Sequence, residues 1–223
     1  MSRLDSQRQR LYGAGRALVL SLGRPADWEL VSRVWQGVQL DLELPAPAIA
    51  VSGTDAYQLW FSVASPVSRE DALAFLDALR QRYWPDVKPV RVSAVAGDAV
   101  PAVPTEVDAD GNWSAFVARD LAPVFADTPW LDIPPNDDGQ AELLQGLGMI
   151  TPELWAEARA RLAPVEAVSP APAPAVGIGT ATTSDPHAFL LRVMNDPSAP
   201  LALRIDAAKA LLPFTGGREQ PAR

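Results

Sequence analysis

Two acidic residues in the segment QLDLEL, Asp41 and Glu43, have the residue type and spacing of a metal-dependent nucleotidyl-transfer site. Such sites hold two divalent cations between closely placed carboxylates, and the cations stabilise the attacking and leaving oxygens. On a strand the two side chains would share a face, whereas at a helix end both would lie in solvent. No third acid or histidine accompanies them at a recognisable spacing. We therefore predict no catalytic residue and no cofactor, and keep Asp41 and Glu43 with Mg²⁺ or Mn²⁺ as the alternative.

The composition excludes several other kinds of chemistry. The chain of 223 residues has no cysteine, so disulfides, thiolate metal sites and cysteine nucleophiles are absent. A Ser-His-Asp triad would have to use His187, the single histidine. His187 follows Pro186 at an expected helix start with no acid at helical spacing, so we interpret it as a surface or capping residue.

Arginines near the N-terminus are the first candidate contacts to nucleic acid. The formal net charge is −8, and residues 25–184 alone carry −13, so the body as a whole does not attract DNA. Contacts by the body would fall to four arginines of the basic N-terminus: Arg3, Arg8, Arg10 and Arg16. So few phosphate contacts would make DNA binding weak and sensitive to salt.

The segment RQRYW is the second candidate contact to nucleic acid. Arg80 and Arg82 flank the ring of Trp84 in sequence, and an aromatic ring among cations can stack on a base. The alternative is a helix end whose arginines complement the helix dipole.

The composition divides the chain into a body, a linker and a tail. Pro and Ala alternate after residue 162, followed by Gly, Thr and Ser, and such a segment buries too little apolar surface to offset its ordering entropy. We predict an α+β body at 1–162, a flexible linker at 163–184 and a helical tail at 185–223. The longest early apolar run, 17–22, is too short for a membrane span or a signal peptide, so we expect a cytoplasmic protein without membrane contact.

Helices and strands are mixed along the body. Apolar spacings of three and four predict a helix over 28–42 after Asp27, and a helix with a stripe over 73–83 that Ser68 caps. Apolar runs predict strands at 48–52 and 57–63, joined as a hairpin, and further strands at 90–95 and 112–118. Two helices close the body at 140–147 and 152–162. This order predicts an α+β fold with a mostly antiparallel sheet and flanking helices.

The second hairpin strand, 57–63, has two chemically different faces. Gln58, Trp60 and Ser62 share one of them. The other face holds aliphatic and aromatic residues: Tyr57, Leu59, Phe61 and Val63. We expect this apolar face to pack on the helix that follows Ser68.

The tail is expected to form a C-terminal helical hairpin. The first helix begins at 184–186 and carries Phe189, Leu190, Val193 and Met194, and the second has Ile205, Leu211 and Leu212 on one face. Helices of about ten residues are marginal alone. Their apolar faces must therefore close on each other, on the body or on another chain, and we predict that they dock a protein partner. The sequence leaves the oligomeric state open.

A turn at Ser52 and Gly53, followed by Tyr57, Gln58 and Trp60, carries a first family resemblance. The segment 48–83 resembles the strand-turn-strand-helix region of archaeo-eukaryotic-type primases, especially plasmid replication primases. Polymerising members of that superfamily use upstream acids and a histidine near this strand, and Gln58 stands here in place of the histidine. The resemblance implies a primase-like body, with a primase-polymerase-like nucleotidyltransferase of a mobile element as the alternative function.

The tail carries a second resemblance. Over 185–214 it has the pattern D-P-x-x-F-L-x-x-V-M-x-D-P followed by R-x-x-A-A-K-A-x-x-P-F. This is similar to a helical segment of phage terminase small subunits and related mobile-element proteins. The two resemblances together imply a bacterial phage or mobile-element protein, and we expect a non-enzymatic accessory or adaptor whose tail docks a protein partner, with DNA contact possible and weak.

Overall fold

The structure is a computed structural model that describes residues 1–107, 111–163, 186–196 and 201–215. The chain divides into two units, Met1–Glu166 and Ala167–Arg223. The predicted linker, 163–184, lies outside the described residues apart from residue 163. The elements of the first unit are α1 (Arg3–Tyr12), β1 (Ala17–Gly23), α2 (Trp28–Leu40), β2 (Ala48–Val51), β3 (Ala56–Ser62), α3 (Arg69–Tyr83), η1 (Pro89–Arg91), β4 (Val92–Ala96), η2 (Gly97–Ala99), β5 (Thr105–Glu106), β6 (Trp113–Val117), η3 (Ala122–Phe125), α4 (Asp137–Gln145) and α5 (Pro152–Leu162).

The strands of the first unit form one sheet in the order β4-β1-β3-β2-β6-β5. Every neighbouring pair of strands is antiparallel. From β1 to β4 the chain runs β-α-β-β-α-β, and the spatial order of these four strands is that of a ferredoxin-like sheet. β6 and β5 extend this sheet beyond β2. The predicted α+β class with a mostly antiparallel sheet is confirmed.

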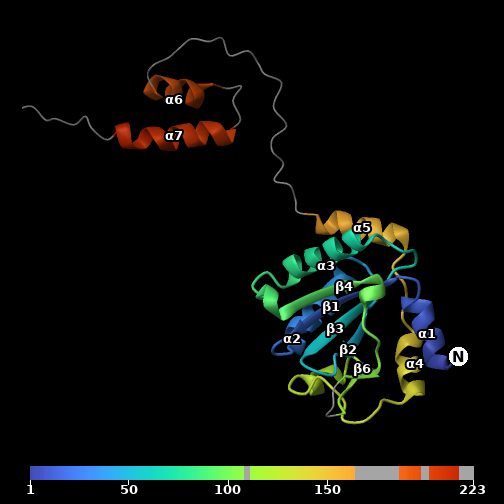
Figure 1. The fold of residues 1–223 in the computed structure, drawn as a ribbon. Helices are drawn as coiled ribbons and strands as arrows, with labels where there is room; N and C mark the ends of the chain where they lie inside the picture. Colours follow the sequence, from blue (N-terminus) through green and yellow to red (C-terminus); the bar gives the residue numbers. More distant parts are fainter. Residues whose placement is uncertain (108–110, 164–185, 197–200, 216–223) are drawn as a thin grey trace, which may run out of the picture. The chain divides into compact units, whose positions relative to one another are not determined.

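Helices α2, α3 and α5 cover one face of the sheet, and α3 and α5 lie side by side (Figure 1). The predicted caps are confirmed, since Asp27 accepts from the N–H of Leu30 at 3.1 Å and Ser68 accepts from the N–H of Asp71 at 3.0 Å. The apolar face of β3 packs here as predicted. The Phe61 and Phe75 rings, for example, have their centroids 6.2 Å apart.

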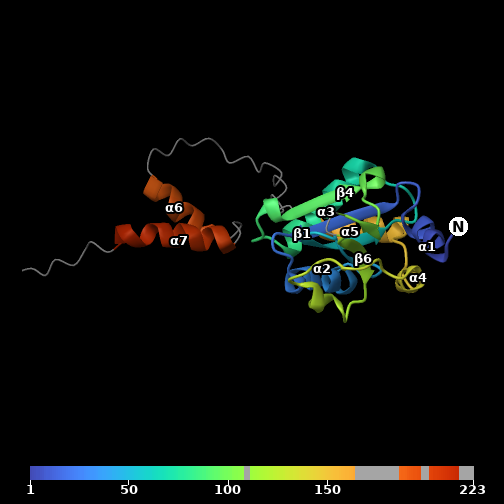
Figure 2. The same ribbon diagram turned by 60° about the horizontal axis from the view of Figure 1, so that its bottom comes forward.

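Helices α1 and α4 lie side by side over the opposite face of the sheet (Figures 1 and 2). The face of β3 that carries Gln58, Trp60 and Ser62 points this way, and all three side chains are buried. A second hydrophobic cluster forms here from both layers: Leu4, Leu11, Val19, Ala48, Ala50, Trp60, Val103, Phe116, Ala141 and Leu144.

In the second unit, α6 (Pro186–Asn195) and α7 (Leu201–Thr215) pack against each other. Ala207 and Leu211 are buried, and the guanidinium of Arg204 donates to the carbonyl of Met194 at 3.1 Å. These contacts form the predicted helical hairpin. Within the described ranges of both units, no helix is long and apolar enough to cross a bilayer.

Candidate functional site

The acidic pair lies at a helix end and not on a strand. Asp41 terminates α2, and Glu43 follows with a left-handed φ of 56°. The Asp41 carboxylate accepts from the Tyr83 hydroxyl at 3.0 Å and lies 3.6 Å from the Arg82 guanidinium. Burial, together with this hydrogen bond to Asp41, raises the pKa of Tyr83 to about 12. Glu43 pairs with Arg161 of α5 at 2.9 Å.

These contacts do not fit a site for two divalent cations. Each carboxylate has a guanidinium partner, and Arg161 also donates to the Asp41 carbonyl at 2.9 Å. The pair therefore ties the end of α2 to α3 and α5. Among the described residues, no group of three or more His, Cys, Asp or Glu side chains is placed to hold a metal ion.

The prediction that Trp84 stacks on nucleic acid is wrong. Trp84 is 1% exposed, and its indole N–H donates to the carbonyl of Leu30 in α2 at 2.8 Å. The chain leaves the α3 helix at this residue and turns the ring into the core beneath α2. Arg80, at 2.8 Å from Asp77, and Arg82 occupy the last turn of α3, where cations complement the helix dipole.

Three of the four N-terminal arginines bind the protein itself. Arg3 donates to the side chain of Gln145 at 2.5 Å, and Arg16 donates to the carbonyls of Gly13 and Gln9, each at 2.8 Å. Arg10 donates to the carbonyls of Leu144 at 2.8 Å and Leu147 at 3.1 Å, at the end of α4. These guanidiniums hold α1 and α4 in place. The sequence did not predict this role, because the acceptors of Arg10 and Arg16 are backbone carbonyls, which leave no residue-type signal, and the acceptor of Arg3 is 142 positions away.

Arg8, the fourth, lines a pocket of about 500 Å³ between α1 and the segment after β4. Asp98, Trp60 and Phe116 also line it. These two rings are only 4% and 2% exposed, because Tyr12 packs against both, with ring centroids 5.2 and 6.1 Å away. Burial raises the pKa of Tyr12. The rings therefore attach α1 to the sheet and offer little surface for stacking.

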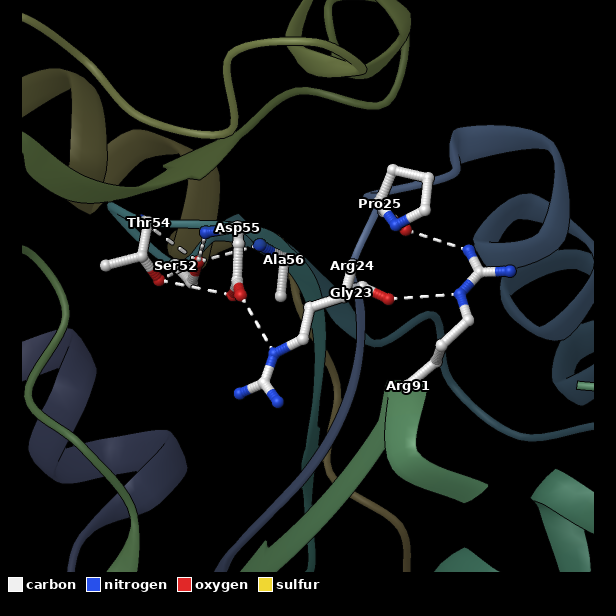
Figure 3. Close-up of polar contacts among 8 residues, drawn as sticks. All are labelled: Gly23, Arg24, Pro25, Ser52, Thr54, Asp55, Ala56 and Arg91. Carbon is white, nitrogen blue, oxygen red and sulfur yellow. Dashed lines mark hydrogen bonds and ion pairs between the residues drawn. The ribbon is translucent and has the colours of Figure 1, made fainter. Parts of the chain in front are cut away.

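Residues of the segment 48–83 build the hairpin turn between β2 and β3 (Figure 3). The Ser52 hydroxyl accepts from the backbone N–H groups of Thr54, Asp55 and Ala56 at 3.2, 3.2 and 3.0 Å. Gly53 has a φ of 85°, and a Cβ there would lie 2.9 Å from the N–H nitrogen of Ser114. The turn thus requires both Ser52 and Gly53 for its own geometry.

Two arginines bind to this turn and to the neighbouring end of β1 (Figure 3). Arg24 pairs with Asp55 at 3.1 Å, and both side chains are at least half exposed. Arg91 donates to the carbonyls of Gly23 at 3.1 Å and Pro25 at 2.8 Å. Both arginines were missed in the sequence, and both stabilise the loop ends.

The side chains of Tyr57 and Gln58 in the same segment have internal partners. The Tyr57 hydroxyl donates to the carbonyl of Ala122 at 2.6 Å, and burial raises the pKa of Tyr57. Gln58, in the place of a histidine in polymerising primases, accepts from the indole N–H of Trp60 at 3.0 Å. Each of these polar groups therefore serves to stabilise the fold.

The apolar residues of the tail divide between its interior and its surface. Leu211 is 4% exposed, so it closes the hairpin and is unavailable to a partner, contrary to its predicted docking role. Leu190, Val193 and Met194 are half-buried, whereas Ile205 is exposed. Leu191 and Leu203, which were not predicted, are also exposed. The side chains of Phe189 and Leu212 lie outside the described part of the tail.

Comparison of the sequence with protein-family models finds no match, and a search of curated proteins finds no significant relative.

Proposed function

We propose that this protein is a non-enzymatic accessory or adaptor protein of a bacterial phage or other mobile element, acting in the cytoplasm, and that its tail docks a protein partner. The observation that carries the proposal is the apolar surface of the α6–α7 hairpin. Leu191, Leu203 and Ile205 are 37%, 55% and 45% exposed. The interior of the hairpin is closed without them by Ala207 and Leu211. Burial of these exposed side chains against a partner would be favourable.

The sequence that joins the two units supports this proposal. Residues 163–184 are rich in Pro and Ala, the composition from which a flexible linker is predicted. A tether of this kind lets a small helical unit engage a partner independently of the body. The resemblance of 185–214 to a segment of phage terminase small subunits agrees with a role in a mobile-element assembly.

Any contact of the body with DNA is proposed to be weak. Arg3, Arg10 and Arg16 donate to groups of the protein, and the flanking sequence 25–184 carries a charge of −13. Arg8 at the rim of the pocket is then the main cation of α1 available to a phosphate. One such contact gives low affinity and a shallow salt dependence.

The docking proposal is tested in the full chain by placing a charge on the tail surface. Leu203→Asp should abolish recovery of the partner from the host or phage lysate while the helix content stays unchanged. Leu121→Asp is the matched control, because Leu121 in the body is also 55% exposed. If both variants recover the same proteins as the wild type, the tail surface does not dock a partner.

A second candidate, nucleotidyl transfer, is favoured by one observation. The primase-like segment 48–83 folds as β2, a turn, β3 and α3 within a β-α-β-β-α-β sheet. Against it, Asp41 and Glu43 are engaged by arginines, and Gln58 by Trp60. A primer-extension assay with Mn²⁺ decides between the two functions. Extension by the wild type that is lost in the Asp41→Ala/Glu43→Ala double variant would overturn the non-enzymatic proposal.

A further inference from the structure

The two edges of the sheet differ in how they are protected from other chains. At one edge, β5 is only two residues long and includes Glu106. The Gln140 side chain makes hydrogen bonds to the backbone N–H and carbonyl of Phe116 in β6 at the same edge. At the other edge, β4 has the sequence VSAVA, with no charge, proline or glycine. Exposed edge strands in monomeric proteins normally carry charged residues, proline or bulges that prevent pairing with another chain. The difference between the two edges indicates that the β4 edge pairs with another strand.

The backbone of β4 turns hydrogen-bonding groups toward this open edge. The carbonyl of Arg16 accepts from the N–H of Val63, so the even-numbered residues of β1 bond to β3 and the odd-numbered ones bond to β4. Ser93 and Val95, opposite Ser21 and Val19, therefore bond to β1. Ala94 lies between them and directs both its N–H and its carbonyl outward.

Apolar surface surrounds the same edge. Val90, just before β4, is 71% exposed. Beside the strand, a groove of about 230 Å³ runs between β4 and α3; its walls are mainly apolar, with Leu20, Leu76, Val92 and Ala94, and also include the ion pair of Asp77 and Arg80. Figure 1 shows β4 next to α3. This side of β4 is thus open to an incoming strand.

We propose that β4 pairs with β4 of a second copy of this chain, in an antiparallel ladder about a two-fold axis at Ala94. In this register Ala94 faces its own equivalent, and the two exchange a reciprocal pair of N–H···O=C bonds. Val92 of each copy then lies opposite Ala96 of the other. The five residues of the strand, Val92–Ala96, are all paired, and the two sheets become one continuous sheet.

Charge at the two ends of β4 favours a second copy as the occupant. Asp86, Lys88 and Arg91 precede the strand and sum to +1, whereas Asp98 follows it with −1; Asp86, Lys88 and Asp98 are exposed. An antiparallel two-fold arrangement brings the basic end of each strand to the acidic end of its partner. Antiparallel pairing with a strand that begins acidic and ends basic would bring like charges together. Parallel pairing of two copies of β4 would do the same. The edge is therefore complementary to itself.

The test is the oligomeric state of the full chain, measured by sedimentation velocity over a wide concentration range. The wild type should form a dimer. Ala94→Lys and Ala94→Glu each place like charges opposite each other at the two-fold axis and should weaken the dimer roughly tenfold or more. Ala156→Lys, at an exposed alanine of α5, is the matched control and should dimerise like the wild type.

Mixing separates loss of the interface from loss of the fold. Equal amounts of the Ala94→Lys and Ala94→Glu variants should form a heterodimer, because opposite charges then face each other. A wild type that stays monomeric throughout would overturn the proposal. So would a dimer that Ala94→Lys leaves intact, or a mixture of the two variants that stays monomeric.

Discussion

The side-chain amide of Gln140 makes both hydrogen bonds that a neighbouring strand would make to Phe116. Its Oε1 accepts from the Phe116 N–H at 2.8 Å, and its Nε2 donates to the Phe116 carbonyl at 2.9 Å. Gln140 is 6% exposed, and it belongs to α4. A helix thus completes the sheet on the side where β5 ends.

Replacing Gln140 by leucine should lower the free energy of unfolding by about 2 to 4 kcal/mol, because two buried backbone groups lose their partners. Chemical denaturation measures this change. Gln145→Leu is the control. Gln145 lies exposed in the same helix, and its side chain accepts a hydrogen bond from Arg3, which is also exposed. Equal losses for the two variants would contradict a special role for Gln140.

Trp84 is expected to matter for stability and not for nucleic-acid binding. Trp84→Ala should cost about 3 to 5 kcal/mol, the range for a buried large aromatic side chain. Trp130→Ala should cost less, because Trp130 is half-buried in a loop. Denaturation of both variants and a DNA shift assay check this. A Trp84→Ala protein of normal stability that loses DNA binding would restore the stacking interpretation.

Stability should fall between about pH 10 and pH 12 partly through Tyr83. Its pKa is raised from 10.0 to about 12, so the folded state favours the neutral phenol. The stability from this group is therefore complete below pH 10 and is lost as the pH rises toward 12. Tyr83→Phe should make the decline in unfolding free energy shallower across this window. An unchanged pH profile would show that Tyr83 does not titrate in this way.

Arg10 and Arg8 should differ in their effect on stability although both belong to α1. Arg10→Met removes bonds to the carbonyls of Leu144 and Leu147 and should cost about 1 to 3 kcal/mol. Arg8→Met should change stability by less than about 0.5 kcal/mol, as is usual for surface substitutions. Thermal unfolding of the two variants compares them. The reverse order would place the structural contact at Arg8.

The sequence predicted those elements whose ends and faces are marked locally. Ser68 and Asp27 begin helices as expected, and both side chains accept from backbone N–H groups three residues on. The hairpin over 48–63 was visible because the turn at Ser52 interrupts two apolar runs. Period-two alternation also assigned the faces of β3 correctly.

Among the elements that were missed, β1 and α1 have atypical patterns. All seven residues of β1 are buried, so its sequence ALVLSLG shows no alternation of polar and apolar residues. Helix α1 is largely polar and buries only Leu4 and Leu11. Its signal was the reciprocal capping pair of Ser2 and Asp5, whose backbone and side-chain bonds begin the helix.

The candidate site was the least predictable part. Asp41 and Glu43 were identified by type and spacing, yet their partners Arg82 and Arg161 are distant in sequence. Only the packing of α2 on α3 and α5 brings these charges together. Trp84 was misplaced for the same reason, since its partner, the Leu30 carbonyl, belongs to another helix.

The attachment of α1 to α4 has a consequence for synthesis on the ribosome. Arg3 and Gln145 are 142 positions apart in the chain, and Arg10 and Leu144 are 134 apart. Helix α1 emerges first, but its partner emerges roughly 10 s later at ordinary translation rates. Until then Trp60 and the other apolar residues on that face of the sheet lack the cover of α4. The nascent chain therefore presents a hydrophobic surface that a chaperone can hold until the last third of the body has been made.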